Sequence, residues 1–389
     1  MAAIAGVVLL AGCTAAPTPS GPASSTPTGT ATGTPNQSAT TPAVPKETQC
    51  AADVVETMNL AEQVGQLVMV GVTTGAAAEL NVLRKQQIGS VIVMGTHREG
   101  VRGVKKLTAS FTVDGQKTPI LVAVDQEGGT VQRLKGSGFD TIPTARSQST
   151  WSTATLKSRA AEWGEQLADA GVQMTLAPVA DVVPVSMRST NAPIGQLKRD
   201  YGADPKKVAD RVAAVIDGMQ SAGVATSAKH FPGLGRVRGN TDFSARVIDS
   251  VTTTNDPFME PFQAAIKAGG ESIMMSTAFY ARIDSANRAV FSSKVIGLLR
   301  NKFGFDGVII SDDLGVAQSV SSIAPASRGI RFIKAGGDLA ITVDPYRAAA
   351  LVRGIRTAAE ESTTVAAQVK AAAIRVVTLK VKLGLVPCR

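Results

Sequence analysis

The feature that most constrains the fold is a series of eight short apolar runs between residues 66 and 343. The runs are rich in Val and Ile and mostly do not alternate with polar residues, which is the pattern of parallel strands buried on both faces. Longer amphipathic stretches with helical character lie between them, several with a capping residue before and a Gly after. The expected strands are residues 66–72, 90–95, 120–125, 174–181, 224–231, 272–279, 307–313 and 338–343.

Eight strands that alternate with helices predict an α/β fold of the (β/α)8 TIM-barrel type. A doubly wound open sheet would show the same alternation, but eight repeats over this length favour a closed barrel. Residues 346–384 are expected to be helical, which leaves no room for a second domain after the eighth unit. The barrel is therefore expected to occupy residues 50–389 as a single domain.

The start of the chain has a different character. Residues 1–12 form an apolar run that ends in small residues, directly before Cys13. This pattern is typical of a bacterial lipoprotein signal, which is cleaved before a cysteine whose sulfur then carries the lipid, although the usual positively charged start is missing. The run is too short for a transmembrane helix. We expect a signal peptide over residues 1–12 and a lipid on Cys13, with a disordered apolar tail as the alternative.

Residues 13–49 consist largely of Thr, Pro, Ser, Ala and Gly. A segment of this composition cannot bury enough apolar surface to offset the loss of chain entropy, so we expect a disordered linker. The linker would tether the barrel to the outer face of the cell membrane, which places the protein in the bacterial cell envelope, or outside the cell after shedding.

The remaining cysteines, Cys50 and Cys388, lie at the two ends of the expected barrel. Disulfides persist outside the cytoplasm, and a closed barrel brings its first and last elements together, so we expect these two to pair. Two half-buried thiols are the alternative. No group of cysteines and histidines has metal-ligand spacing, so neither a metal nor another cofactor is expected.

The net charge of +9 comes from scattered basic residues, without a long basic run, and aromatic residues make up only 4% of the chain. Binding to nucleic acid is therefore disfavoured. Affinity for anionic envelope polymers or lipid head groups fits the charge, and so does an ordinary solvated surface. We expect a monomer.

Polar residues follow four of the expected strands, and the chemistry of such barrels takes place at the carboxyl ends of the strands. Two carboxyl groups around a sugar are the minimal equipment for cleaving a glycosidic bond, although an acidic pair alone is also compatible with a metal site or a helix cap. The residues at these strand ends are Asp125, Asp181, Lys229, His230, Asp312 and Asp313.

The segment AVDQEGGTVQRL adds a second signal. Asp125 ends a strand, Gly128 and Gly129 permit close approach of the backbone, and Arg133 follows shortly after. Carboxylate and guanidinium groups make paired hydrogen bonds to sugar hydroxyls. An aspartate that caps a helix, next to an ordinary surface arginine, is the alternative.

The order of the motifs carries a specific resemblance. VDQEGGTVQRL, the segment with NAPIG and YGADP over residues 191–205, KHFPGLG and FGFDGVIISDDL resemble glycoside hydrolase family 3, in particular its single-domain β-N-acetylglucosaminidases. The resemblance extends over residues 52–385, and the motifs come in the order of the family.

The resemblance implies sugar-binding roles for five residues. Asp125 corresponds to the carboxylate that holds sugar hydroxyls, and Arg133 to the arginine of the same motif. Lys229 and His230 correspond to the pair that contacts the bound sugar. Arg199 corresponds to an arginine of the family, but here a two-residue insertion precedes it and Asp-Tyr replaces Ser-Phe after it.

The resemblance also implies that Asp312 is the nucleophile, whereas Asp313 would have a supporting or structural role. The family's acid/base residue is missing, because KHFPGLGRVRGNTDFSA stands where the family has KHFPGHGDTxxDSH. Counting without gaps, Asp242 occupies the place of the acid/base histidine. The only histidines are His97, which follows the second expected strand, and His230, which belongs to the sugar-contacting pair. We expect Asp242 to be the acid/base, with a pKa raised by Asp312 and by burial; an ordinary loop residue is the alternative.

These observations predict a retaining exo-β-N-acetylglucosaminidase that acts on peptidoglycan fragments through a glycosyl-Asp312 intermediate. The alternatives are a β-glucosidase-like enzyme, a family 3 enzyme that uses phosphate instead of water, and a lipoprotein that binds glycan without cleaving it.

Overall fold

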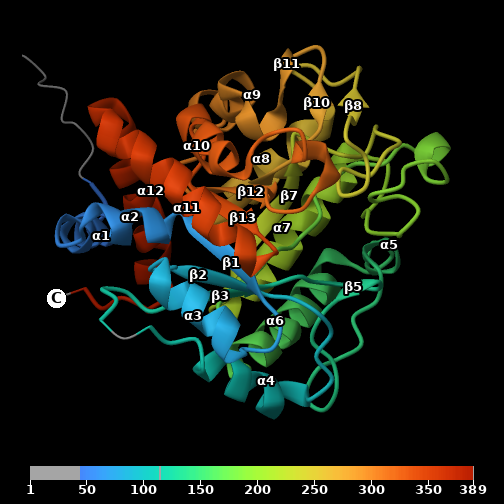
Figure 1. The fold of residues 1–389 in the computed structure, drawn as a ribbon. Helices are drawn as coiled ribbons and strands as arrows, with labels where there is room; N and C mark the ends of the chain where they lie inside the picture. The colour runs from blue at the N-terminus through green and yellow to red at the C-terminus, as the bar shows by residue number, and fades with distance from the viewer. Residues whose placement is uncertain (1–43, 114, 389) are drawn as a thin grey trace, which may run out of the picture. The chain divides into compact units, whose positions relative to one another are not determined.

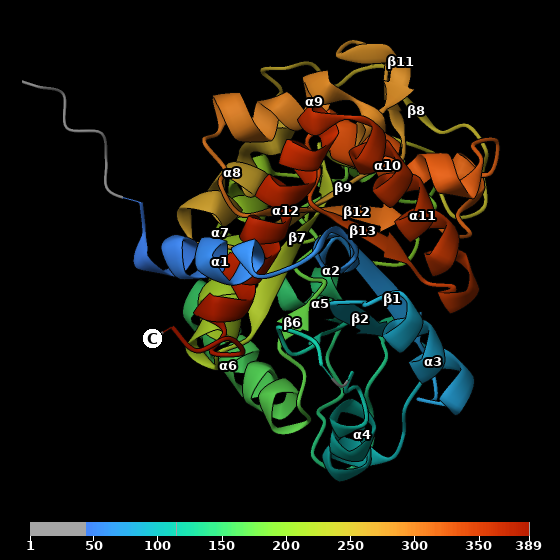
Figure 2. The same cartoon turned by 60° about the vertical axis from the view of Figure 1, so that its left-hand side comes forward.

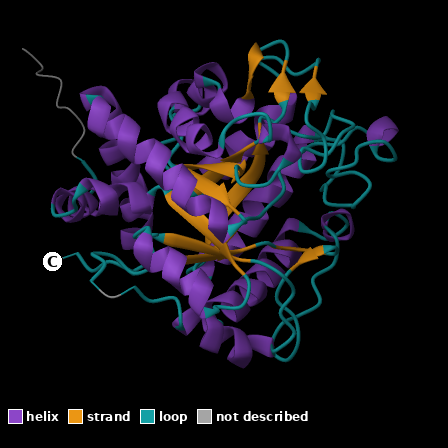
Figure 3. Ribbon diagram, viewed as in Figure 1, coloured by secondary structure: helices purple, strands orange, loops and turns teal. Residues whose placement is uncertain are grey.

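The computed structural model describes residues 44–113 and 115–388, and its core is a closed barrel of eight parallel strands (Figures 1 and 3). Neighbouring strands follow one another around the barrel in chain order, and the last strand pairs with the first. The predicted (β/α)8 barrel is thus confirmed. Its strands are β1 (Val68–Val72), β2 (Ser90–Val93), β3 (Leu121–Val124), β6 (Met174–Thr175), β7 (Ala225–Phe231), β9 (Ser272–Met275), β12 (Val308–Asp313) and β13 (Leu339–Thr342).

Helices surround the strands, as Figure 3 shows by colour. Side chains that alternate along each strand explain this arrangement: in β1, Val68 and Val70 pack toward the helices, whereas Met69 packs inside the barrel. Both faces of β1 are therefore apolar. The helices are α1 (Lys46–Glu56), α2 (Leu60–Gln66), α3 (Ala77–Lys85), α4 (Gly100–Ala109), α5 (Ala145–Gln148), α6 (Thr153–Asp169), α7 (Pro205–Ser221), α8 (Glu260–Lys267), α9 (Ser293–Gly297), α10 (Pro325–Ala335), α11 (Pro345–Glu361) and α12 (Thr363–Lys382).

All eight strands are shorter than the sequence predicts, most of them by one or two residues, and the fourth and sixth by much more. The fourth ends at Thr175 instead of residue 181, because Pro178 has no N–H to continue the ladder, although Val179 still bridges to Lys229. The sixth ends at Met275. The chain beyond it joins a small sheet formed by β8 (Ile248–Asp249), β10 (Phe279–Tyr280) and β11 (Asp284–Arg288). A hairpin of β4 (Gln126–Gly128) and β5 (Val131–Gln132) follows β3.

The amino ends of the strands are closed by α12. Val376 and Leu379 of this helix belong to the cluster that fills the barrel interior. The fully buried Lys380 donates hydrogen bonds to the Gln66 side chain at 2.7 Å, to Thr118 at 3.0 Å and to the Pro119 carbonyl at 2.8 Å. Burial lowers the pKa of Lys380 to about 7. The bottom of the barrel is therefore sealed by apolar packing around one buried amine.

The first helix lies beside the last, as the second view shows (Figure 2). In the structure a disulfide joins Cys50 on α1 to Cys388, with 5.7 Å between their Cα atoms. Helix α1 begins at Lys46, inside the stretch predicted as linker, so the folded part starts about four residues earlier than expected. Residues 1–43, with the predicted signal and Cys13, lie outside the described residues.

Within the described part of the chain, no helix is both long and apolar enough to span a membrane.

Candidate active site

A cavity of about 550 Å³ opens at the carboxyl ends of the barrel strands. Seven strands contribute to its wall directly or through the loops that follow them, so distant parts of the sequence meet there. The structure places every predicted glycan-site residue in this cavity: Asp125, Arg133, Arg199, Lys229, His230, Asp242 and Asp312.

Glu127 connects the cations in the cavity wall. Its carboxylate binds Arg199 through both oxygens, at 2.7 and 2.8 Å, and one of these oxygens also lies 2.7 Å from the Lys229 Nζ. Lys229 in turn donates to Asp125 at 2.7 Å. Two cations bind this buried carboxylate and one of them also binds Asp125, so the four charged groups form a network in which each contact restrains the next.

The charges of this network support one another. Burial alone would raise the pKa of Glu127, but the neighbouring Arg199 and Lys229 lower it to about 2. Burial would lower the pKa of Lys229, yet Asp125 and Glu127 raise it. The lysine is therefore a permanent cation in the cavity wall.

The hairpin that carries Glu127 depends on two glycines. Gly128 has φ +105°, and a Cβ there would lie 2.3 Å from the Pro143 carbonyl oxygen. The Gly129 N–H donates to the Ile142 carbonyl at 2.9 Å. The close backbone approach expected from the EGG motif thus presses the hairpin against residues 142–143, which fixes the position of Glu127.

His230 is held by a buried carboxylate. Its Nδ1 lies 2.7 Å from one oxygen of Asp181, whose other oxygen accepts the backbone N–H groups of His230 and Leu234. Because a carboxylate can only accept, Nδ1 carries a proton, and Nε2 has no hydrogen-bond partner among the residues that the structure describes. Asp181 therefore orients His230 at the cavity wall.

The two acids at the end of β12 differ in their surroundings. Asp313 accepts four backbone N–H groups, from Gly315, Val316, Ala317 and Val343, so its carboxylate shapes the loop after the strand. This agrees with the structural role expected for it. The partly buried Asp312 accepts only the N–H of Asp313, at 2.8 Å on Oδ1, so Oδ2 has no partner among the described residues. Burial raises the pKa of Asp312 above its ordinary value, and the neighbouring His230 opposes this.

Asp242 lies in the same cavity, on the loop after β7. The loop is fixed by hydrogen bonds from Asp242 N to the Asn240 side chain at 2.9 Å and from Gln318 N to the Asp242 carbonyl at 3.1 Å. Although the residue as a whole is exposed, loss of water around its carboxyl group and the charge of Asp312 raise its pKa to about 6. Asp242 is thus an acid that can hold a proton close to neutral pH.

Arg133 completes the wall without an acidic partner. Its backbone N–H donates to the Gln126 side chain at 3.1 Å, and its buried Nε has no hydrogen-bond partner in residues 44–113 and 115–388. A buried donor of this kind costs free energy unless a ligand satisfies it.

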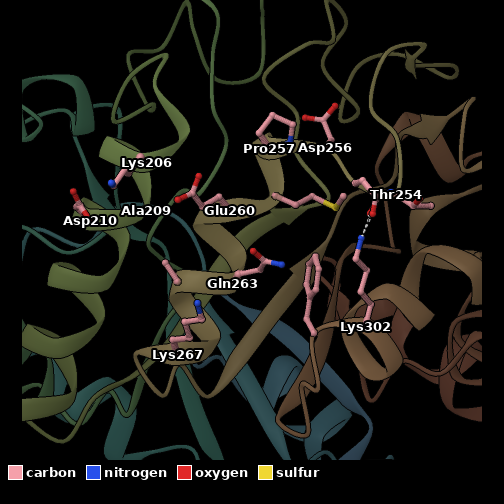
Figure 4. Close-up of a pocket in the computed structure, with 14 residues that line it drawn as sticks. Lys206, Ala209, Asp210, Thr254, Asp256, Pro257, Glu260, Gln263, Lys267 and Lys302 are labelled. Atoms are coloured by element: carbon pink, nitrogen blue, oxygen red, sulfur yellow. Dashed lines mark hydrogen bonds between the residues drawn. The ribbon is translucent and has the colours of Figure 1, made fainter.

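A second cleft, of about 450 Å³, lies between the outer helices α7 and α8 (Figure 4). Lys206 and Asp210 come from α7, Glu260 and Lys267 from α8, and Lys302 is held by the Thr254 carbonyl. No strand end reaches this cleft, and none of the predicted site residues lies in it. In the part of the chain that the structure describes, no cluster of ligand side chains fits a metal ion.

The sequence reasoning missed two residues of the site. Glu127 stands inside the quoted EGG motif, but only the fold shows that it binds Arg199 across 72 positions of the chain. Asp181 was noted at a strand end without a partner, and its contact with His230 spans 49 positions. The sequence did offer one signal. More acidic residues lie near the expected strand ends than a nucleophile and an acid/base require, which indicates that some of them bind and orient other side chains.

Comparisons with known proteins identify the family of this chain. The model of the glycosyl hydrolase family 3 N-terminal domain matches residues 59–379. A β-hexosaminidase of Stenotrophomonas maltophilia is 29% identical over 291 residues, which is 72% of this chain and 84% of the relative. The β-hexosaminidase LpqI of Mycobacterium tuberculosis is 28% identical over 354 residues, 88% of each chain.

The solved structures show the same likeness. The β-N-acetylhexosaminidase of Beutenbergia cavernae has a TM-score of 0.80 and 41% identity, and the match covers 84% of this chain and 98% of that one. The structure of M. tuberculosis LpqI has a TM-score of 0.75 and 26% identity, with coverage of 85% and 96%. This chain therefore belongs to glycoside hydrolase family 3 and is a glycoside hydrolase acting on O-glycosyl bonds.

Proposed function

We propose that this protein is a retaining exo-β-N-acetylhexosaminidase in which Asp312 is the nucleophile and Asp242 the acid/base. The observation that carries the proposal is the pairing of these two acids in one cavity. Asp312 has an unpartnered carboxylate oxygen, and the pKa of Asp242 is raised to about 6. A glycosidase needs such a division between an attacking carboxylate and a protonated acid.

The proposed mechanism has two displacements. Asp312 attacks the anomeric carbon while the bond to the leaving oxygen breaks and Asp242 gives its proton to that oxygen. A water molecule then attacks the same carbon, loses a proton to Asp242, and the bond to Asp312 breaks. Two inversions give net retention, and Asp242 ends protonated as it began.

The other charged residues that line the same cavity would bind the sugar that is released. Asp125 offers carboxylate oxygens, and Lys229 and Arg133 offer donors, all suited to sugar hydroxyls. Arg199 lines the cavity and is fixed by Glu127. The relatives named β-hexosaminidase and β-N-acetylhexosaminidase support N-acetylhexosamine as this sugar.

For the source of the sugar we propose peptidoglycan fragments, in the cell envelope. Support comes from the lipoprotein-like start of the chain, with Cys13 before a Thr/Pro-rich stretch. We further propose that water, not phosphate, releases the sugar, because the ionised Asp242 beside Asp312 would repel a phosphate anion.

The test uses p-nitrophenyl β-N-acetylglucosaminide and p-nitrophenyl β-glucoside with the wild type, Asp312→Ala and Asp306→Ala. Asp306 is exposed before the amino end of β12, so this variant is a matched control. We expect turnover of the first substrate, loss of activity only in Asp312→Ala, and a β-anomer as the first product by NMR. Preference for the glucoside would overturn the sugar assignment, an α-product would overturn retention, and no turnover of either would overturn the enzyme proposal.

A further inference from the structure

The active-site cavity has an apolar rim. Phe243 is 81% exposed, Val316 49% and Leu197 37%, and all three line the cavity. Only eight large hydrophobic side chains are this exposed in residues 44–113 and 115–388, so three of the eight gather at one opening. Exposed apolar side chains scattered singly need no explanation, whereas a group at a cavity mouth indicates a ligand surface.

The position of Phe243 relates it to one part of the substrate. It directly follows Asp242, which under the proposed function protonates the oxygen of the leaving group. The rest of the leaving group is attached to that oxygen. Because Asp242 and Phe243 are adjacent in the chain and both line the cavity, we expect the leaving group to lie near Phe243. The sugar that is released would instead be bound by Lys229 and Asp125, which come from the ends of β7 and β3.

The rim is held in place by backbone hydrogen bonds. The Phe243 N–H donates to the Asn240 carbonyl at 3.2 Å, and the Ser319 N–H donates to the Thr241 carbonyl at 3.0 Å. The N–H of Val316 donates to Asp313 at 2.8 Å. The loops that carry Phe243 and Val316 are thus joined to one another, and the aromatic ring is presented from a fixed backbone.

Leu197 comes from another loop, in the stretch 196–198 before Arg199, where three residues stand for one residue of the family pattern. This leucine therefore belongs to a segment in which the chain departs from the family pattern. The three side chains carry no hydrogen-bonding atoms, so they select a ligand by apolar area and shape. Ring faces of sugars and aryl groups offer such area, and a methyl group offers little.

We propose that Phe243, with Val316 and Leu197, forms the leaving-group site and makes this enzyme specific for leaving groups with an apolar ring face, such as a pyranose. The inference rests on the proposed function and adds the substrate class on the leaving-group side. Phe243 is a specificity-determining residue that does not take part in proton transfer.

The experiment compares Phe243→Ala with wild type on three β-N-acetylglucosaminides, whose leaving groups are N-acetylglucosamine, phenol and methanol. We expect kcat/KM to fall about tenfold for the disaccharide and the phenyl glycoside, mainly through KM, and to change less than twofold for the methyl glycoside. Phe243→Tyr should restore the disaccharide activity. Val251→Ala, which removes an exposed apolar side chain outside the cavity, should leave all three values unchanged.

Equal losses on all three substrates, or none, would overturn the inference. A binding measurement separates it from the proposed function: in the Asp312→Ala background, Phe243→Ala should weaken binding of the disaccharide about tenfold, with no change for free N-acetylglucosamine. If the wild type proves inactive while this difference holds, the proposed function fails and the leaving-group site stands. If the wild type is active and the difference is absent, only the leaving-group site fails.

Discussion

Glu127 binds Arg199 through both carboxylate oxygens, at 2.7 and 2.8 Å, in the wall of the active-site cavity. The side chain of Glu127 is 5% exposed and that of Arg199 is 14% exposed, so each group has lost most of its contact with water and is stabilised by the other. Breaking a buried pair from one side is costly, because the partner keeps its charge without compensation.

Glu127→Gln should therefore lower both stability and activity. We expect the free energy of unfolding to fall by about 3 kcal/mol at pH 7 and kcat/KM to fall by at least about tenfold, since Arg199 and Lys229 lose their common anchor. The pKa of Glu127 is lowered to about 2 in the folded state from 4.5, so the carboxylate stabilises the fold above pH 4.5, and this is lost as the pH falls toward 2. Urea unfolding at several pH values should show the gap between wild type and variant closing in that range. A gap that stays constant with pH would contradict this explanation.

Asp312 should form a covalent bond to the sugar. A fluorosugar with an activated leaving group slows the second displacement more than the first, so the intermediate accumulates. Intact-mass measurement should show the added sugar on wild type, peptide mapping should place it on Asp312, and Asp312→Asn should show none. Label on Asp313 instead would be inconsistent with the four backbone hydrogen bonds that occupy its carboxylate.

Asp242 should set the alkaline limb of the pH profile. Because the acid must hold a proton and its pKa is about 6, kcat/KM for a substrate with a poor leaving group should fall above pH 6. Asp242→Asn should lose a factor of about 10²–10⁴ on such a substrate and far less on a dinitrophenyl glycoside, whose leaving group needs no proton. Added azide should accelerate the variant and give the β-glycosyl azide, because azide attacks the intermediate without a base.

The matched control for Asp242 is Asp210→Asn, an exposed carboxylate on α7 outside the cavity, which should behave as wild type. If the alkaline limb persists in Asp242→Asn and disappears in His230→Asn, then His230, oriented by Asp181, is the proton donor and the assignment of Asp242 is wrong.

Lys380 should make stability depend on pH in the alkaline range. Its folded pKa is about 7 and its ordinary value is 10.5, so between these values the unfolded chain binds more protons. Stability should therefore rise with pH from 7 toward 10, by roughly 3 kcal/mol between pH 7 and 9.5. Lys380→Met should lack this rise, whereas Lys382→Met, an exposed neighbour, should keep it. Denaturant unfolding at pH 7 and 9.5 measures both, and an identical rise in Lys380→Met would refute the explanation.

The barrel was predictable because its signal is repeated. Eight apolar runs without alternation indicate strands buried on both faces, and few folds provide this. Helices between the runs then favour a parallel barrel. The cavity residues were predictable for a related reason: parallel strands all end on the same side, so Asp125, Lys229 and Asp312 had to meet.

Other parts of the site depend on packing that no local pattern records. Nothing in the EGG motif distinguishes Glu127 as the partner of Arg199, because the pairing is set by how a hairpin presses on residues 142–143. The exposure of Phe243 likewise depends on a contact between loops that are distant in sequence, since Thr241 and Asp242 accept backbone hydrogen bonds from Ser319 and Gln318. The predicted length of the fourth strand was wrong for a local reason. Pro178 has no N–H for the ladder, but the apolar run around it still has the composition of a strand.

The bond between Cys50 and Cys388 gives the folded part of the chain a covalent topology unlike that of most barrels. Everything from β1 to α12 lies inside one closed ring of peptide and sulfur. A protease that cuts a single surface loop opens the ring without freeing a fragment, and two cuts are needed to detach any strand. The position of the cut therefore decides which strand lies next to a new chain end. Before any cut, both ends of the barrel segment are held by the disulfide.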